Sequence, residues 1–521
     1  MSDGTRVALW PRMDRGRWAL LGVILVSALV FRGLRLDELP AGFHVFNEGF
    51  YIDLASSMVR QPLFGWFLHP LDVNNPPLYS VIVSWLYRLG APHVAGARIV
   101  SVLAGTWSVF VTFALGRLLY DERTGITAAA ILAVMPGVVL VDHNIQVDPL
   151  FVALMLTSLW FYVASARSGS RMLPFVGGAI LGLAFFKKQP AVIALPALAA
   201  WETWCARGLR WLRSDRVWKF ALCFALVGVP WYVIQFFASG PGAMFANASN
   251  IASSGNLGPY FWFDRFGLEL WWMVFPLTAV VAVAGLVVQA VRREPGDKFV
   301  LVMTAVFLLW YVVFNRHTYY LLPLGALAAM SAARALGSLQ RFPRPVFAGA
   351  LALLLVSMAM GTVLMMAGHK WGRWSPMSLQ APARPPGEWS LAVGNGVGDL
   401  FGPTMNLVDP RFVVKQQSDG DYRAEALKSG KPGDASLLLS LVPPPGARPR
   451  QILEATWLRP VLFGYAIALA PEDRVLMNEF RGAAWSSEQV GPIWSFGLQS
   501  TQVPSGYFLY DHTSFGPQAS K

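Results

Sequence analysis

Residues 77–90 read PLYSVIVSWLYRLG, and this stretch decides how the whole chain is threaded. It is apolar but only 14 residues long, and Arg88 lies near its end. A helix needs about 20 apolar residues to cross a bilayer. We therefore predict an amphipathic helix that lies at a membrane surface. Counting the stretch as a crossing would place every later loop on the opposite side.

The apolar content of the chain is typical of a polytopic membrane protein. Of its 521 residues, 55% are hydrophobic and 14% are charged, and the hydrophobic residues come in runs close to the length of a membrane span. We predict an all-α membrane domain of eleven transmembrane helices, near residues 18–34, 97–119, 125–141, 148–165, 172–187, 189–205, 218–238, 266–291, 298–314, 319–335 and 346–367.

The distribution of positive charge sets the predicted orientation. The net charge is +12, but Arg and Lys occur in short clusters between apolar runs, which argues against a nucleic-acid partner. With the N-terminus in the cytoplasm, the clusters at Arg123, Arg171, Arg213, Arg293 and Arg341 fall on the cytoplasmic side, as the positive-inside tendency requires. This agreement holds only if residues 77–90 do not cross. Usage of Ala, Arg, Trp and Gly suits a bacterial plasma (inner) membrane.

The two ends of the chain carry further predictions. No small-residue cleavage pattern follows the first apolar run, so we predict an uncleaved anchor rather than a signal peptide. The transmembrane domain is predicted to cover residues 1–370, with residues 35–96 as its first outer loop. Beyond it the segments SLLLSLV (436–442) and GPIWSFGL (491–498) are typical of strands. We predict a small extracytoplasmic α/β domain over residues 371–521, which either caps the helices or takes part in substrate recognition.

Polar groups that could support chemistry gather on the predicted outer face. The loop HVFNEGFYIDLASSMVRQPLFGWFLHPLDVNNPPLY, residues 44–79, carries several carboxylates, which are costly beside a bilayer unless they function or stay hydrated. Three later loops add further groups, and such convergence is what a site at the mouth of a helix bundle needs. The candidates are Asn47, Glu48, Asp53, His69, Asp72 and Asn74 in the first loop, then His143, Asp148, Lys187, Lys188, Arg316, His317, Tyr319 and Tyr320.

Several of these residues also have a purely structural explanation. Asp148 precedes Pro149 at the start of a helix and could cap its free amides. Lys188 could extend to the membrane interface, and Tyr319 and Tyr320 could belong to an aromatic belt. The histidines at positions 44, 69, 143 and 317 show no spacing typical of metal ligands, so we expect no metal and no cofactor.

Carboxylates on one group of loops and cations on another suit transfer of a group from a lipid phosphate. A carboxylate can take the proton of an acceptor hydroxyl, which typically contributes about 10²–10⁴-fold to the rate. Cations stabilise the charge that builds on the departing phosphate.

Five segments in a fixed order carry a resemblance to a known family. They are NEGFYIDLASSM (47–58), NNPPLYSVIVSWLYRLG (74–90) followed by ARIVSVLAG (97–105), QVDPLFVAL (146–154), FFKKQPAVIALPALA (185–199) and NRHTYYLLPLGALAAM (315–330). In order and topology they resemble the GT-C membrane glycosyltransferases, in the branch of the protein O-mannosyltransferases and the aminoarabinose transferases that modify lipid A. The resemblance implies transfer of a sugar from a polyprenyl-phosphate donor to a lipid, envelope glycan or protein, with inversion and without metal.

The resemblance also implies roles for particular residues. Glu48 and Asp148 match the family's acidic positions and Lys188 the lysine that contacts the donor's phosphate, while Arg316 and Tyr319 fall where the family closes a loop over the donor. Asn47 stands where the family has its usual catalytic Asp, and an amide cannot accept a proton. Glu48 is then expected to act as the base, with Asp148 in support. The remaining substrate-binding candidates are Asn47, Asp72, Asn74 and His317.

Two other functions remain open from the sequence. A catalytically inactive relative could bind a lipid-linked sugar, and Asn47 favours it. A transporter of lipids or sugar-lipids would need paired halves and charges in mid-membrane, which the sequence does not show.

Overall fold

The structure is a computed structural model that describes residues 13–36, 51–52, 54–56, 58–59, 62, 77–253, 273–314, 318–338 and 343–369, together with seven short strands beyond residue 388. Among these residues, the side chains of residues 93, 238–239, 241–253, 313–314, 318–319, 364–365 and those after 366 are not described. The chain divides into two compact units. The first comprises residues 1–36, 61–85 and 98–362, and the second comprises residues 37–60, 86–97 and 363–521.

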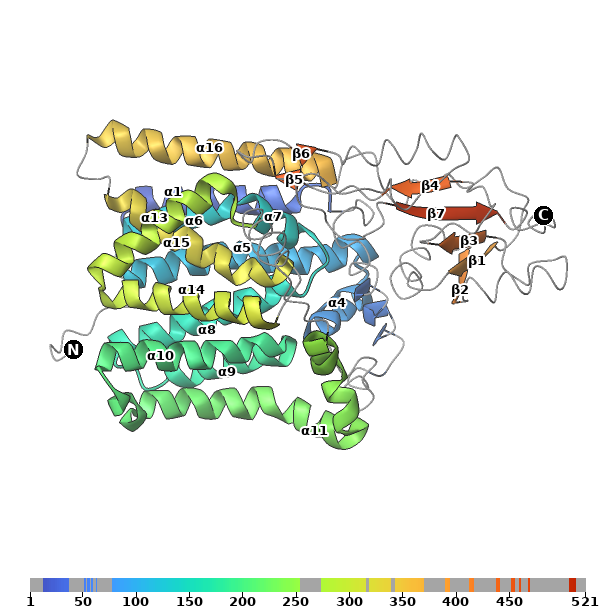
Figure 1. Ribbon diagram of the computed structural model, residues 1–521, viewed down its shortest axis with the longest axis horizontal. Coiled ribbons are helices and arrows are strands. Elements are labelled where there is room, and N and C mark those ends of the chain that lie inside the picture. Colours follow the sequence, from blue (N-terminus) through green and yellow to red (C-terminus); the bar gives the residue numbers. More distant parts are fainter. Residues whose placement is uncertain are drawn as a thin grey trace. The chain divides into compact units, whose positions relative to one another are not determined.

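The first unit consists of helices (Figure 1). The α-helices are α1 (Arg15–Gly33), α4 (Leu78–Arg88), α5 (His93–Leu119), α6 (Glu122–Ala133), α7 (Pro136–His143), α8 (Asp148–Ser168), α9 (Leu173–Lys187), α10 (Ala194–Ala206), α11 (Asp215–Ser253), α13 (Pro276–Arg292), α14 (Pro295–Phe314), α15 (Leu322–Ser338) and α16 (Arg344–His369). Among the described residues, 3₁₀ segments lie between some of them: η1 (Gln189–Ile193), η2 (Leu209–Arg213) and η4 (Thr318–Leu321). The last residues of α4, the first residues of α5 and the end of α16 belong to the second unit.

Each predicted span overlaps a described helix or two consecutive ones, and residues 266–272 of the span predicted at 266–291 lie outside the described residues. Six described helices are long and apolar enough to cross a bilayer, and a seventh crossing results if α6 and α7 are counted together. α9 and α13 are apolar but shorter. The predicted surface segment 77–90 is indeed the short helix α4, while its place relative to a bilayer stays a prediction.

The predicted span 125–141 is wrong as a single helix, because the chain breaks and bends by 62° between α6 and α7. Pro136, the first residue of α7, has no N–H to donate to the carbonyl of Leu132 and its ring clashes with a continuing helix. Inside a membrane, carbonyls freed by a break must find other donors. The hydroxyl of Thr362 donates to the carbonyl of Val134 at 2.8 Å, and Arg32 serves the two carbonyls before it.

Local chemistry fixes the ends of several helices. Asp14 and Asp121 cap α1 and α6, each accepting a hydrogen bond of 2.8 Å from a backbone N–H in the first turn. α8 ends at Gly169, whose φ of 65° is the left-handed conformation that glycine adopts without strain. α11 kinks at Gly240, where φ is 78°. Glycine and aspartate residues thus fix these helix ends, which the apolar runs of the sequence alone do not define.

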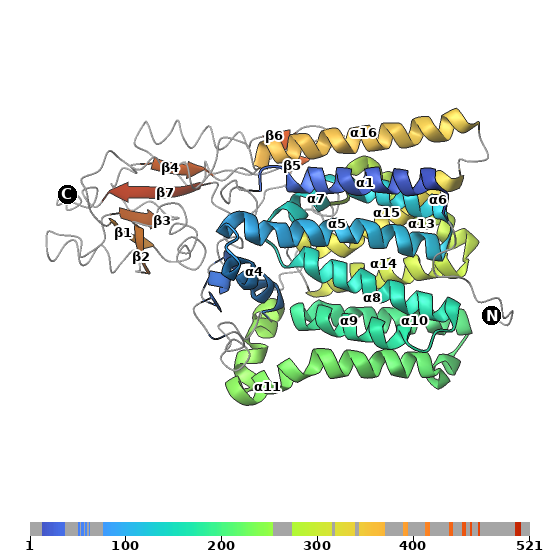
Figure 2. The ribbon, with the colours of Figure 1, turned by 180° about the vertical axis from the view of Figure 1, so that it is seen from behind.

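The long helices lie side by side, with α11 and α16 at opposite edges of the bundle in both views (Figures 1 and 2). α9 packs on α8 and α11, and α15 packs on α13 and α6. Gly178 and Gly182 of α9 let the backbone of α11 approach closely, since a Cβ on Gly178 would lie 2.1 Å from the carbonyl oxygen of Phe220. The outer faces of edge helices remain apolar, as at Val23 and Leu226, which are 62% and 64% exposed.

The second unit contains a five-stranded mixed sheet with strand order β2-β1-β3-β7-β4. The strands are β1 (Trp389–Val393), β2 (Phe412–Gln416), β3 (Leu437–Ser440), β4 (Gln451–Glu454) and β7 (Gly506–Asp511), and β5 (Arg459–Pro460) pairs with β6 (Ile467–Ala468). β1 runs parallel to β2 and β3, and β7 runs antiparallel to β3 and β4. β3 confirms the strand predicted in SLLLSLV, whereas GPIWSFGL lies outside the described residues. The boundary at residue 370 stays a prediction.

Candidate functional site

A buried ion pair joins the start of α8 to the end of α9. Nζ of Lys188 lies 2.5 Å from Oδ1 of Asp148, and the two side chains are 13% and 1% exposed. Asp148 opens α8, and Lys188 is the extended residue that ends α9, with φ −154° and ψ 123°. Pro190 follows at the start of η1, so the chain turns immediately after the lysine. Two residues 40 positions apart, both named from the sequence, are thereby brought together.

The structure shows how this pair is placed relative to the helix start and to its neighbours. The residue at the N-cap of α8 is Val147, so the Asp148 carboxylate does not occupy the capping position. The Lys188 ammonium donates to the Asp148 carboxylate. It also lies 3.8 Å from the centre of the Tyr320 ring, close enough for a cation–π contact. Tyr320 belongs to η4 and packs against Trp310 of α14, so a third part of the chain joins the site.

Asp148 retains one unused hydrogen-bonding atom. Its Oδ2 is buried and accepts no hydrogen bond from the part of the chain that the structure describes. The same is true of both side-chain polar atoms of Gln146, a residue that is 1% exposed. Buried polar atoms are nearly always hydrogen-bonded in native proteins. Unsatisfied atoms next to a buried ion pair mark the position as one that can receive a polar ligand.

The short connection between α7 and α8 is held from both sides. The hydroxyl of Ser101, on α5, donates to the carbonyl of Gln146 at 2.9 Å and lies 3.3 Å from its N–H. Tyr79 of α4 hydrogen-bonds the same hydroxyl at 3.1 Å. On the other side, Nδ1 of the buried His143 lies 2.8 Å from the carbonyl oxygen of Arg32. A carbonyl only accepts, so Nδ1 carries the proton.

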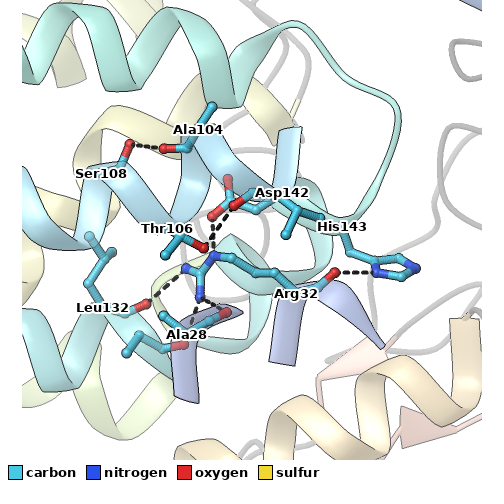
Figure 3. Close-up of polar contacts among 10 residues, drawn as sticks. Ala28, Arg32, Ala104, Thr106, Ser108, Leu132, Asp142 and His143 are labelled. Carbon is cyan, nitrogen blue, oxygen red and sulfur yellow. Dashed lines mark hydrogen bonds and ion pairs between the residues drawn. The ribbon is translucent and has the colours of Figure 1, made fainter. Parts of the chain in front are cut away.

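A second buried ion pair lies beside this connection (Figure 3). Nε of Arg32, at the end of α1, donates to Oδ2 of Asp142 in α7 at 2.8 Å, and the side chains are 0% and 2% exposed. Sequence reasoning missed Arg32, which stands at the end of an apolar run and resembles an ordinary flanking cation. The signal that could have found it is an arginine inside the predicted first span, since ionisable groups there face the bundle interior and pair with one another.

The polar groups of the bundle are sorted between its two ends. One end holds the contacts of the cationic clusters, such as Arg17 with Glu122 at 2.9 Å and Arg334 with Asp297 at 3.2 Å. The opposite end of the bundle holds the Asp148–Lys188 and Arg32–Asp142 pairs, with Arg17 and Arg32 at the two ends of α1. The basic clusters and the candidate site therefore lie at opposite helix ends, while the assignment of one end to the cytoplasm stays a prediction.

Much of the predicted site lies outside the described residues: Asn47, Glu48, Asp53, His69, Asp72, Asn74, Arg316 and His317, and the side chain of Tyr319. Lys187 is buried at 2% beside Lys188. Within the described part, no three His, Cys, Asp or Glu side chains lie close enough together to hold a metal ion.

The comparisons with known proteins agree with this architecture. Residues 74–234 match a family described as dolichyl-phosphate-mannose-protein mannosyltransferase. A polyprenol-phosphate-mannose–protein mannosyltransferase of Corynebacterium glutamicum is 28% identical over 164 residues, 29% of each chain. An undecaprenyl phosphate-α-4-amino-4-deoxy-L-arabinose arabinosyl transferase of Pseudomonas paraeruginosa is 28% identical over 232 residues, 40% of this chain and 39% of the relative. The matched segments thus span well under half of these curated relatives.

Solved structures share the fold over a longer stretch. ArnT from Cupriavidus metallidurans bound to undecaprenyl phosphate superposes with a TM-score of 0.55 at 15% identity, covering 82% of this chain and 93% of ArnT. An Archaeoglobus fulgidus oligosaccharyltransferase gives a TM-score of 0.53 at 12% identity, covering 82% and 69%. The chain therefore shares its fold with membrane glycosyltransferases of the GT-C class and is similar in sequence to some of them, which confirms the resemblance carried by its ordered segments. Within that class it is similar to protein mannosyltransferases and to aminoarabinose transferases.

Proposed function

We propose that this protein transfers a sugar from a polyprenyl-phosphate donor to an acceptor hydroxyl at the outer face of the plasma membrane, with inversion at the anomeric carbon. The observation that carries the proposal is the buried Asp148–Lys188 pair, packed against Tyr320 and lying opposite the cationic clusters. The Lys188 ammonium is a fixed cation, which departure of the phosphate requires. The Asp148 carboxylate beside it is a group that can bind the acceptor. The acceptor is a lipid, an envelope glycan or a protein.

The proposed step forms one bond and breaks one. The acceptor oxygen attacks the anomeric carbon, and the bond from that carbon to the phosphate oxygen breaks. The proton of the acceptor hydroxyl moves to the carboxylate of Glu48, and polyprenyl phosphate leaves with one more negative charge than the donor carried. Lys188 stabilises that charge as a point cation. Asp148 positions the acceptor through its unused oxygen.

Asn47 shapes this assignment. Its amide cannot take a proton, so Glu48 is the proposed base, and Asn47 binds a sugar hydroxyl instead. Asp72, Asn74, Arg316, His317 and Tyr319 are proposed to complete the donor and acceptor sites. The proposed arrangement has eleven spans, a cytoplasmic N-terminus, a catalytic loop over residues 35–96 and an extracytoplasmic domain over residues 371–521.

Purified protein in detergent, incubated with a panel of polyprenyl-phosphate sugars and candidate acceptors, tests the proposal. Wild-type protein is expected to release polyprenyl phosphate, and Glu48→Gln and Asp148→Asn to lose about 10²-fold or more of that rate. Glu202→Gln is the control, because Glu202 is a buried carboxylate paired with Arg216 at the other end of the bundle. NMR of the product gives the anomeric configuration.

Two other outcomes would overturn the proposal. If donors bind but no panel member is consumed and the variants behave alike, the protein is an inactive relative that binds lipid-linked sugar. If labelled donor crosses proteoliposomes without forming a glycosidic bond, the protein is a transporter. Chelation with EDTA is expected to leave the rate unchanged, and loss of activity that Mg²⁺ or Mn²⁺ restores would contradict metal independence.

A further inference from the structure

Arg32 occupies the gap that the break between α6 and α7 opens (Figure 3). Nη1 donates to the carbonyl of Ala133 at 2.8 Å, and Nη2 donates to the carbonyl of Leu132 at 3.2 Å. Pro136 cannot supply the N–H that a continuous helix would offer to Leu132. A cation is also favoured at the carbonyl end of a helix, where the helix dipole is negative. Arg32 therefore serves as the C-terminal cap of α6.

The same guanidinium binds the second half of the broken helix. Its Nε donates to Asp142 in α7 while Nη1 and Nη2 hold the end of α6. Gly105 of α5 makes room for this contact, because a Cβ there would lie 2.4 Å from the Asp142 carboxyl. One buried side chain thus fixes the angle between α6 and α7.

That angle determines where α8 begins. His143 ends α7 and is bound to the backbone carbonyl of Arg32, and Asp148 opens α8 after a connection of four residues. Ser101 holds the same connection at Gln146. The backbone between the Arg32–Asp142 pair and Asp148 is therefore held at several points, so the position of the Asp148 carboxylate depends on that pair.

We propose that Arg32 and Asp142 are positioning residues for the Asp148–Lys188 site, an inference that rests on the proposed function. In this proposal they act through the protein rather than by touching a substrate. The cavity beside Asp142 has an accessible volume of about 10 Å³ and is lined mainly by apolar side chains such as Leu132, Val138 and Leu322. It has room for about one water molecule and excludes a sugar.

The test uses a double substitution, Arg32→Met with Asp142→Leu. Removing one partner would leave a buried charge, whereas replacing both by apolar residues of similar size is often tolerated. The matched control is Arg334→Met with Asp297→Leu, a buried pair at the other end of the bundle. Arg32→Lys is a third variant, because lysine keeps the charge but lacks the fork that serves carboxylate and carbonyls together.

Three measurements are made on each variant: kcat and KM for the donor, the thermal unfolding midpoint, and hydrogen exchange of peptides covering residues 143–150. The Arg32/Asp142 double variant is expected to lose roughly 10²-fold in kcat, as small misplacements of catalytic groups do. Its KM is expected to stay within about threefold of wild type, and its residues 143–150 to exchange faster. The control pair is expected to lower the unfolding midpoint without changing kcat, and Arg32→Lys to fall between.

Unchanged kcat and unchanged exchange in the folded Arg32/Asp142 double variant would overturn the inference, as would an equal loss of kcat in the control pair. The exchange measurement needs no substrate. Should wild-type protein consume no donor, the proposed function fails, while faster exchange in residues 143–150 alone still reports on the positioning of Asp148.

Discussion

At the scale of single residues, the site depends on two buried charges that neutralise each other. Lys188 and Asp148 are almost fully withdrawn from solvent, and burying either alone is costly. A donor phosphate that binds the Lys188 ammonium must therefore compete with the Asp148 carboxylate for it. The pair is therefore both a structural contact and a competitor for the ligand, and experiments on either residue must separate the two.

Lys188→Met combined with Asp148→Asn makes this separation, because the double variant removes both charges of the pair together. We expect polyprenyl phosphate to bind about 10- to 100-fold more weakly, since a hydrogen bond to a charged group contributes about 1.5–3 kcal/mol. Equilibrium binding of labelled polyprenyl phosphate measures the change. Lys219→Met is the control, since Lys219 pairs with exposed Asp215 at 3.5 Å. If the double variant binds polyprenyl phosphate with wild-type affinity, Lys188 does not contact the phosphate.

Gly105→Ala tests the space that the Asp142 carboxyl occupies. A methyl group there meets the carboxyl carbon at 2.4 Å, so the Arg32–Asp142 pair must shift. We expect a loss of about 1–3 kcal/mol in the free energy of unfolding, the usual cost of overpacking. Gly22→Ala in α1 meets no atom within 4 Å and should instead stabilise by about 0.5–1 kcal/mol. Denaturation in detergent compares the two, and equal effects would show that the close contact is relieved without cost.

At the scale of secondary structure, apolar runs predicted the helices well because span length and composition are local properties. What they missed is the break at Pro136, which lies inside a run that is apolar throughout. The break is stable only because Arg32 and Thr362, more than 100 residues away on either side, supply donors to the freed carbonyls. No local pattern carries that information.

For the site as for the helices, the sequence predicted which residues matter but not the contacts between them. Asp148 and Lys188 stood out because charged residues are rare between apolar runs. Their direct contact depends on how α8 packs on α9, which the sequence does not state. Arg32 was overlooked for the opposite reason, since a cation at the end of an apolar run is usually an interfacial anchor.

The packing of α9 on α11 carries a prediction of its own. Gly178→Ala would place a methyl group 2.1 Å from a backbone carbonyl oxygen of α11, which cannot rotate away. The helices must separate, and we expect the free energy of unfolding to fall by about 1–3 kcal/mol. Donor affinity should fall as well, because α9 ends at Lys187 and carries Lys188. Gly337→Ala, with nothing within 4 Å, is the control for thermal unfolding. A neutral Gly178→Ala would contradict the close packing.

At the scale of the whole molecule, the two ends of the helix bundle differ in chemistry. The end with Arg17, Glu122, Asp297 and Arg334 carries the contacts of the basic loops, and the other end carries the site. If the basic loops are cytoplasmic, as the positive-inside tendency requires, the site opens outside, where polyprenyl-linked sugars are proposed to be consumed. The short helix α4 decides this assignment, since one added crossing would reverse it.

Two cysteine positions test the assignment directly. Cys205 is exposed at the end of α10, and Leu89, 84% exposed after α4, can be changed to Cys in a Cys205→Ser/Cys223→Ser background. The crossings predicted between them are α5, the α6–α7 pair, α8, α9 and α10, so the two positions should lie on opposite sides. We expect a membrane-impermeant maleimide to label Leu89→Cys in intact spheroplasts and Cys205 only after permeabilisation. The reverse pattern would mean that α4 crosses and that the site faces the cytoplasm. Labelling of both from one side would instead show that one of the five crossings between them is not made.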